Sequence, residues 1–210
     1  MRLFFVLLAV ISSCWLFPGN SFPFEHPIPV SASIAPLADL VSQVGGEFVK
    51  VQLLVPNGSS PHTSEPKPSD IKALSDTRAL FLVGGGLEMF APDMVKATEK
   101  MFPVIEVNSG IEIINGSNNG ASSDPGNTAG NPHIWLSLRN AQIIVRNIAN
   151  ALSQIDPAGS TKYRENAELY IQKLEDLDAW FRKESEKIAV KDFVTQHAAW
   201  VYFARDYGFV

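Results

Sequence analysis

One run of residues limits the folds open to this chain more than any other: residues 160 to about 189 contain neither Pro nor Gly. Apolar and aromatic side chains recur along this run every three or four residues, which is the spacing of one helical face. They are Tyr163, Ala167, Tyr170, Leu174, Leu177 and Phe181. A helix of about 30 residues reaches on the order of 45 Å, about the length of a small domain. The run therefore predicts a single long helix that could serve as a spine between two lobes.

The chain before this run alternates strand and helix signals. Short apolar stretches stand at 29–35, 48–56, 78–86 and 103–107, and helical patterns separate them. Short buried strands separated by helices are typical of a parallel sheet with crossover helices. We therefore predict an α/β fold, in which residues 22–159 form an N-terminal lobe with a parallel sheet and flanking helices.

A further helix is predicted directly after Ser137, whose hydroxyl suits the N-cap position. Apolar residues lie on one face of this helix at the required spacing. They are Ala141, Ile144, Val145, Ile148 and Leu152. The Asp156-Pro157 pair then breaks the pattern before the spine begins.

Residues 1–21 have the features of a secretory signal peptide, with Arg2 followed by a short apolar core and small residues at Gly19 and Ser21. The mature protein is then expected in the periplasm or on the extracellular face of the cell membrane. Cys14 is the only cysteine, so the mature chain would hold no disulfide. The stretch "ISSC" also fits a lipobox, which leaves lipid anchoring through Cys14 open. The apolar run continues past Cys14, and this favours ordinary cleavage.

The chain carries a formal net charge of −5 at pH 7. A protein that binds nucleic acid normally presents a basic surface to the phosphates. The charge therefore gives no reason to expect a nucleic-acid partner.

Three of the four histidines stand in similar positions, at loops or at the ends of predicted elements. His62 and His133 each follow a proline, and His197 follows a strand predicted at 192–195. Neutral imidazoles that converge on one point are suitable ligands for Zn²⁺. Their spacing matches no short metal-binding signature, so the residues alone leave two interpretations open. The three histidines share a metal site, or they are unrelated and hydrogen-bonded at separate surface loops.

Four stretches of the chain together resemble the zinc- and manganese-type substrate-binding proteins of bacterial ABC importers. They are "LLVPNGSSPHTSEPKPSDIKAL", "NPHIWLSLRNA", "YRENAELYIQKLEDLD" and "VTQHAAWVYFARDYG". The resemblance runs from about residue 30 to residue 210. It implies two α/β lobes joined by one long rigid helix, with a metal ion held between the lobes.

The resemblance also implies the ligands, which would be His62, His133 and His197. Relatives associated with manganese commonly have a carboxylate in the third position, so an imidazole there favours Zn²⁺ over Mn²⁺. The expected function is capture of a divalent transition metal outside the cytoplasm and its delivery to the membrane permease of an ABC importer. We expect a monomer and no enzymatic activity.

The chain departs from the family pattern in three places. The loop at 115–131 contains no histidine, and Asn131 and Ser137 stand where acidic residues are usual. The family's fourth ligand, Asp or Glu, would lie beyond residue 210. Residues 190–210 are accordingly expected to be the start of a truncated C-terminal lobe, after a spine at 160–189.

Two alternative functions remain open from the sequence. One is a metal-linked adhesin or surface protein, since some relatives have an adhesive role in addition to metal binding. The other is a zinc hydrolase, in which a three-histidine site activates water beside a general base. Glu65 is the one candidate base close to these motifs.

Overall fold

The computed structural model describes residues 27–65, 67–114 and 130–210. Within these ranges four strands form one parallel sheet in the order β2-β1-β3-β4. The strands are β1 (Ile28–Ala32), β2 (Val49–Leu53), β3 (Leu80–Leu82) and β4 (Val104–Glu106). The predicted α/β fold with a parallel sheet is thereby confirmed. The predicted signal segment at 1–21, with Cys14, and nearly all of the loop at 115–131 lie outside the described residues.

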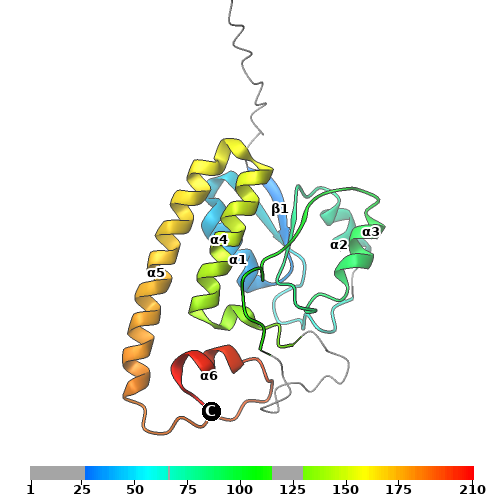
Figure 1. Cartoon of the computed structure of the whole chain (residues 1–210). Coiled ribbons are helices and arrows are strands. Elements are labelled where there is room, and N and C mark those ends of the chain that lie inside the picture. The colour runs from blue at the N-terminus through cyan, green and yellow to red at the C-terminus, as the bar shows by residue number, and fades with distance from the viewer. Residues whose placement is uncertain (1–26, 66, 115–129) are drawn as a thin grey trace, which may run out of the picture.

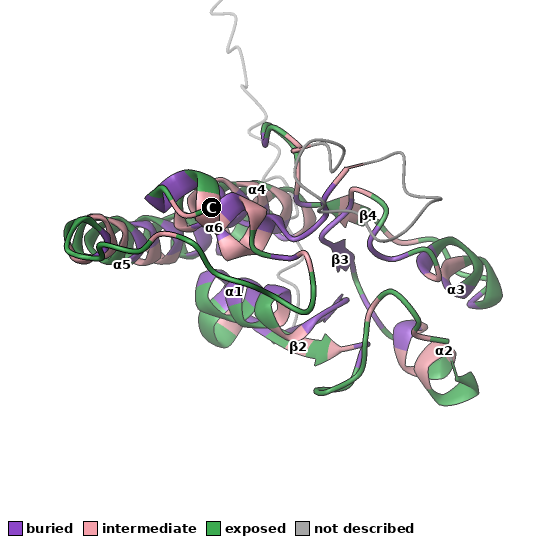
Figure 2. Ribbon diagram, turned by 90° about the horizontal axis from the view of Figure 1, so that it is seen from below, coloured by how far each residue is buried: buried purple, intermediate pink, exposed green. Residues whose placement is uncertain are grey.

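Helices cover both faces of the sheet (Figures 1 and 2). The helices of one side are α1 (Ala35–Gly45), α4 (Leu138–Ile155) and α5 (Ser160–Glu186). Those of the other side are α2 (Pro68–Leu74) and α3 (Ala91–Ala97). Successive side chains of β3 serve the two sides in turn, as a strand requires. Phe81 belongs to the larger core with α1, α4 and α5, whereas Leu80 and Leu82 belong to a smaller core with α2 and α3.

Helix α4 confirms the pattern predicted after Ser137. The Ser137 hydroxyl accepts a hydrogen bond from the main-chain N–H of Asn140, which is the N-cap contact. All five apolar residues predicted on the inner face are buried. The short 3-10 turn η3 (Pro157–Gly159) then separates α4 from α5.

Helix α5 is the long helix predicted from residue 160, and it ends at Glu186 rather than at about residue 189. Its first part packs against α1 and α4, where Tyr163, Ala167 and Leu174 are buried. Beyond them Leu177 is 44% exposed, and Phe181 packs against α6 (Val201–Tyr207) instead. The end of α5 therefore extends past the sheet, where it packs against α6 (Figure 1). None of the helices in the described ranges is both long and apolar enough to span a bilayer.

The strand predicted at 192–195 was wrong. These residues have no regular secondary structure, and Val194 is fully exposed to solvent. Their backbone lies beside the end of the chain, where the N–H of Phe193 donates to Val210 O and the N–H of Val210 donates to Lys191 O. In the described part of the chain no strand of the sheet adjoins this segment. These two hydrogen bonds do not make a ladder, and a β-branched run becomes a strand only where a neighbouring strand pairs with it along its length.

Candidate metal centre

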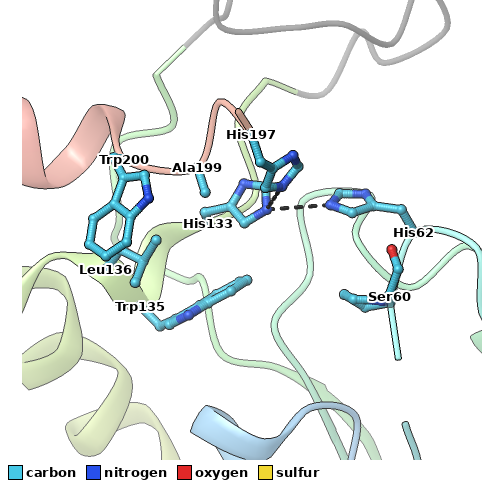
Figure 3. A pocket seen from close by; sticks show the side chains of 9 residues that line it. Ser60, His62, His133, Trp135, Leu136, His197, Ala199 and Trp200 are labelled. Atoms are coloured by element: carbon cyan, nitrogen blue, oxygen red, sulfur yellow. Dashed lines mark hydrogen bonds between the residues drawn. The ribbon is translucent and has the colours of Figure 1, made fainter. Parts of the chain in front are cut away.

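Three loops distant in sequence carry the three predicted histidines to one place. His62 lies in the turn-rich connection between β2 and α2. His133 stands directly before the 3-10 turn η2 (Ile134–Leu136), which leads into α4. His197 lies in the turn that precedes α6. Figure 3 shows His133 in the middle, with the other two rings directed toward it.

The ring nitrogens of the three histidines are close together. The Nε2 atom of His133 lies 3.3 Å from Nε2 of His62 and 2.9 Å from Nε2 of His197. Among the described residues these three form one group whose candidate ligand atoms all lie within 4.8 Å of one another. Imidazole nitrogens coordinate Zn²⁺ at about 2.0–2.1 Å, so ligand atoms around one ion stand a little over 3 Å apart. The observed spacing fits one shared ion.

The three rings differ in their exposure to solvent. His133 is buried, whereas His62 and His197 are exposed. Burial, together with a smaller contribution from the neighbouring His197 and His62 imidazoles, lowers the pKa of His133 to about 4. A histidine of this kind is neutral near pH 7, which is the form that binds a metal ion.

The histidines line an open cavity of about 390 Å³. Its other walls come from Ser60, Pro61, Trp135, Leu136, Ala199 and Trp200. The rings of His133 and Trp135 lie 5.2 Å apart between centroids. The lining of the cavity is mainly apolar, and the imidazole nitrogens are among its few polar groups.

Hydrogen bonds hold α6, and with it the turn of His197, against the start of α4. The Ser137 hydroxyl donates to Asp206, whose carboxylate is buried. The Tyr202 hydroxyl donates to the carbonyl oxygen of Asn131 at 2.6 Å. Arg182 of α5 donates to the main-chain oxygen of Asp206 at 3.0 Å. The wall that carries His197 is thus fixed by polar contacts as well as by aromatic packing.

The structure brings together all three histidines that the sequence singled out and does not bring Glu65 with them. Glu65 is exposed and is not a member of the three-histidine group. Asn131 and Ser137, noted in the sequence only as departures from a family pattern, both prove to contact elements of the site. The contacts of Asn131 with Ala198 and of Ser137 with Asp206 could not be read from the sequence, because these partners lie 67 and 69 residues away along the chain.

Comparison with known families gives the arrangement its context. Residues 30–210 match the family described as zinc-uptake complex component A periplasmic, ZnuA. The chain belongs to this family. Its members are substrate-binding proteins of ABC importers, and the resemblance noted in the sequence is confirmed.

Individual members of the ZnuA family show how far the likeness extends. The chain is 30% identical over 216 residues to the high-affinity zinc uptake system protein ZnuA of Bacillus subtilis and covers 68% of that protein. It is 31% identical to the manganese-binding lipoprotein MntA of Halalkalibacterium halodurans, of which it covers 66%. It is 29% identical to the zinc-binding protein AdcA of Streptococcus pyogenes, of which it covers 42%. The chain therefore spans about two thirds or less of the length of these relatives.

Solved structures agree with this assignment. A zinc-bound deletion mutant of ZnuA superposes with a TM-score of 0.79 at 32% identity, and the match covers 87% of this chain and 68% of that one. The manganese-bound periplasmic metal-binding protein of Candidatus Liberibacter asiaticus gives a TM-score of 0.76 at 29% identity, with 87% and 66% covered. The ZnuA fold thus occurs in structures that hold either metal.

Proposed function

We propose that this protein captures Zn²⁺ outside the cytoplasm through His62, His133 and His197 and passes the ion to the permease of an ABC importer. One observation carries the proposal. Three imidazole nitrogens from three separate loops lie within 4.8 Å of one another at an open cavity. Membership of the ZnuA family supports the same function.

The chemistry of the ligands favours zinc as the cargo. All three candidate ligands are imidazoles, and the described residues place no carboxylate in the group. Imidazole suits Zn²⁺, whereas Mn²⁺ is better matched by carboxylate and carbonyl oxygens. The names of the zinc-binding relatives agree with this preference, although MntA is named for manganese.

The remaining parts of the proposal concern the whole protein. We infer export of the mature chain, action as a monomer, and two lobes joined by α5, with residues 190–210 belonging to the second lobe. The family description as periplasmic supports the location. Lipid anchoring through Cys14 is the alternative mode of attachment, and MntA is named as a lipoprotein.

A zinc hydrolase finds no comparable support. Such an enzyme needs a general base beside the metal-bound water. Glu65, the candidate from the sequence, is exposed and lies outside the histidine group. The ZnuA family consists of substrate-binding proteins, and this favours capture and delivery of the ion over catalysis.

Calorimetric titration of the metal-stripped protein with Zn²⁺ and with Mn²⁺ tests the proposal. We expect one zinc ion per chain, bound more tightly than manganese. The variants His62→Ala and His197→Ala each remove one exposed ligand, so they should fold normally and lose most of the zinc affinity. Glu65→Ala is the matched control, because it alters an exposed side chain of the His62 loop and should bind zinc like the parent protein.

Two results would contradict the proposal. One is a folded parent protein that takes up no zinc. The other is zinc binding that persists unchanged in both histidine variants, since the ion would then be held elsewhere.

A further inference from the structure

We propose that Asn131 is a positioning residue of the site. Its side-chain amide fixes the proton of His133 on Nδ1 and, at the same time, holds the turn that carries His197. The part of this inference that concerns metal binding rests on the function proposed above.

The orientation of the Asn131 amide is set by two backbone groups. The main-chain N–H of His133 can only donate, and it meets Oδ1 of Asn131 at 3.0 Å. The carbonyl oxygen of Ala198 can only accept, and it meets Nδ2 of Asn131 at 2.6 Å. Each end of the amide therefore faces a group of fixed polarity, and a flipped amide would place two donors and two acceptors face to face.

This orientation determines the tautomer of His133. Its Nδ1 atom lies 2.9 Å from Oδ1 of Asn131, and that oxygen can only accept a hydrogen bond. Nδ1 must therefore carry the proton. A neutral imidazole has one N–H, so Nε2 of His133 keeps its lone pair, and that atom faces His62 and His197. The ring is prepared to bind a metal ion without any shift of its proton.

The other end of the amide acts on His197. Ala198, whose carbonyl accepts from Asn131, is the next residue along the chain. The main-chain N–H of Ala199 donates to His197 O at 2.7 Å and closes the turn. One side chain thus links the loop of His133 to the turn of His197. The Nε2 atoms of these two histidines lie 2.9 Å apart.

Asn131 can act as a rigid link because it is itself immobilised. Only 4% of its surface is exposed. Its main-chain N–H donates to Ile114 O at 2.9 Å, and its carbonyl accepts from the buried Tyr202 hydroxyl at 2.6 Å. Tyr202 in turn accepts from the N–H of Ile114 at 3.2 Å. The main-chain N–H and C=O of Asn131 are therefore both fixed by hydrogen bonds, and this holds its side chain in place for the contacts with His133 and Ala198.

Only an amide of this length can make both the contact with His133 and the contact with Ala198. Two substitutions therefore test the two contacts separately. Asn131→Asp keeps the acceptor for His133 but replaces the donor to Ala198 with a carboxylate oxygen. Asn131→Leu is close in size and removes both contacts. Asn166→Asp is the matched control, since Asn166 also donates from Nδ2 to a main-chain carbonyl, that of Val44 at 3.0 Å, on α5 away from the site.

The experiment compares these variants in two states of the full chain. In the metal-free protein, ¹⁵N–¹H correlation spectra of the imidazoles report which nitrogen of His133 is protonated, and hydrogen exchange reports the protection of the Ala199 amide. In the second state Zn²⁺ alone is titrated against a competing chelator. Loss of a hydrogen-bonding partner behind a ligating histidine typically weakens metal binding by about 10- to 100-fold.

We expect the parent protein and Asn166→Asp to show the Nδ1–H form of His133 and equal zinc affinity. Asn131→Asp should keep that tautomer and lose protection at Ala199. Asn131→Leu should show a mixture of tautomers, lose protection at Ala199 and bind zinc more weakly by the factor above. Parent-like spectra, exchange and affinity in Asn131→Leu would overturn the inference, and so would an Nε2–H tautomer in the parent protein. If the parent protein binds no zinc, the proposed function fails, and the metal-free spectra still decide the role of Asn131.

Discussion

At the scale of single residues, the identity of the side chain at position 197 should set the metal preference. With His197 as the third member, the candidate ligand group offers only nitrogen atoms, and a carboxylate there would offer a harder oxygen donor. We predict that His197→Glu lowers the ratio of zinc affinity to manganese affinity, as measured by competitive titration of both ions. His197→Gln is the control, because glutamine has nearly the same size as glutamate but no charge. This variant should weaken the binding of both ions. An unchanged ratio in His197→Glu would contradict the assignment of His197 as a ligand.

A second residue-scale prediction concerns Glu88, a buried carboxyl group of the N-terminal lobe. Its Oε1 accepts from the Ser33 hydroxyl at 2.5 Å and from the N–H of Val83 at 2.8 Å, and its Oε2 accepts from the N–H of Gly84 at 3.1 Å. Glu88→Gln would turn an NH₂ group toward one of these donors. We expect a loss of about 1–3 kcal/mol in the free energy of unfolding, since a buried donor is left unsatisfied.

The pH dependence of this loss follows from the pKa of Glu88, which burial raises above the usual value of 4.5. The folded protein then holds this proton at pH values where the unfolded chain has released it. Stability contributed by the protonated group is complete well below pH 4.5 and declines as the pH rises through 4.5 to the folded pKa. Glutamine does not titrate, so the difference in the free energy of unfolding between the parent protein and Glu88→Gln should narrow from pH 4 upward. Urea unfolding of the two metal-free proteins measures this difference. A difference that widens as the pH rises would contradict this prediction. The control is Glu168→Gln, which alters an exposed side chain and should leave the free energy of unfolding unchanged.

At the scale of the elements, α6 depends on its contact with the start of α4. Ser137 caps α4 and also donates to the buried Asp206 carboxylate. We predict that Ser137→Ala destabilises the protein by about 1–3 kcal/mol, because the N-cap is lost and a buried carboxylate loses a donor. Hydrogen exchange should show the largest loss of protection in α6. Ser42→Ala removes an exposed hydroxyl from α1 and should change neither quantity; equal effects of the two variants would contradict the prediction.

The elements that the sequence predicted correctly are those that local periodicity determines. Helix α4 has its cap and its inner face where the pattern placed them, because a 3.6-residue repeat needs no knowledge of the partner. The strand expected at 192–195 failed for the opposite reason, since a strand forms only beside another strand. Leu177 is exposed because α5 extends beyond the lobe that buries its first part.

The same distinction applies to the site: its candidate residues could be found in the sequence, but their arrangement depends on contacts between distant segments. The histidines could be picked out as candidates, and a family resemblance grouped them, but the spacing of their Nε2 atoms depends on how three loops meet. The contacts of Asn131 reach Ala198, 67 residues further along the chain, and no local pattern encodes them. Sequence reasoning found the ligand candidates and missed the side chain that orients one of them.

At the scale of the whole molecule, a bound ion would connect three parts of the chain that are far apart in sequence. His62 belongs to the β2–α2 connection, His133 to the entry of α4, and His197 to the turn before α6. An ion held by all three joins the sheet lobe to the segment that follows α5. Because the unfolded chain does not present these ligands together, zinc should bind the folded state almost exclusively.

The stabilisation that zinc should provide follows from this preference. At a free zinc concentration of about 100 times the dissociation constant, the free energy of unfolding should rise by about 2.7 kcal/mol. We predict a matching upward shift of the thermal midpoint on adding zinc, reversed by chelator, and a smaller shift with manganese. The shift should be absent in His62→Ala and in His197→Ala, because each variant breaks the connection at a different end, and should persist in Glu65→Ala. Hydrogen exchange would then show zinc-dependent protection both at the His62 loop and at α6; protection confined to one of them would mean that the ion does not bridge the two segments.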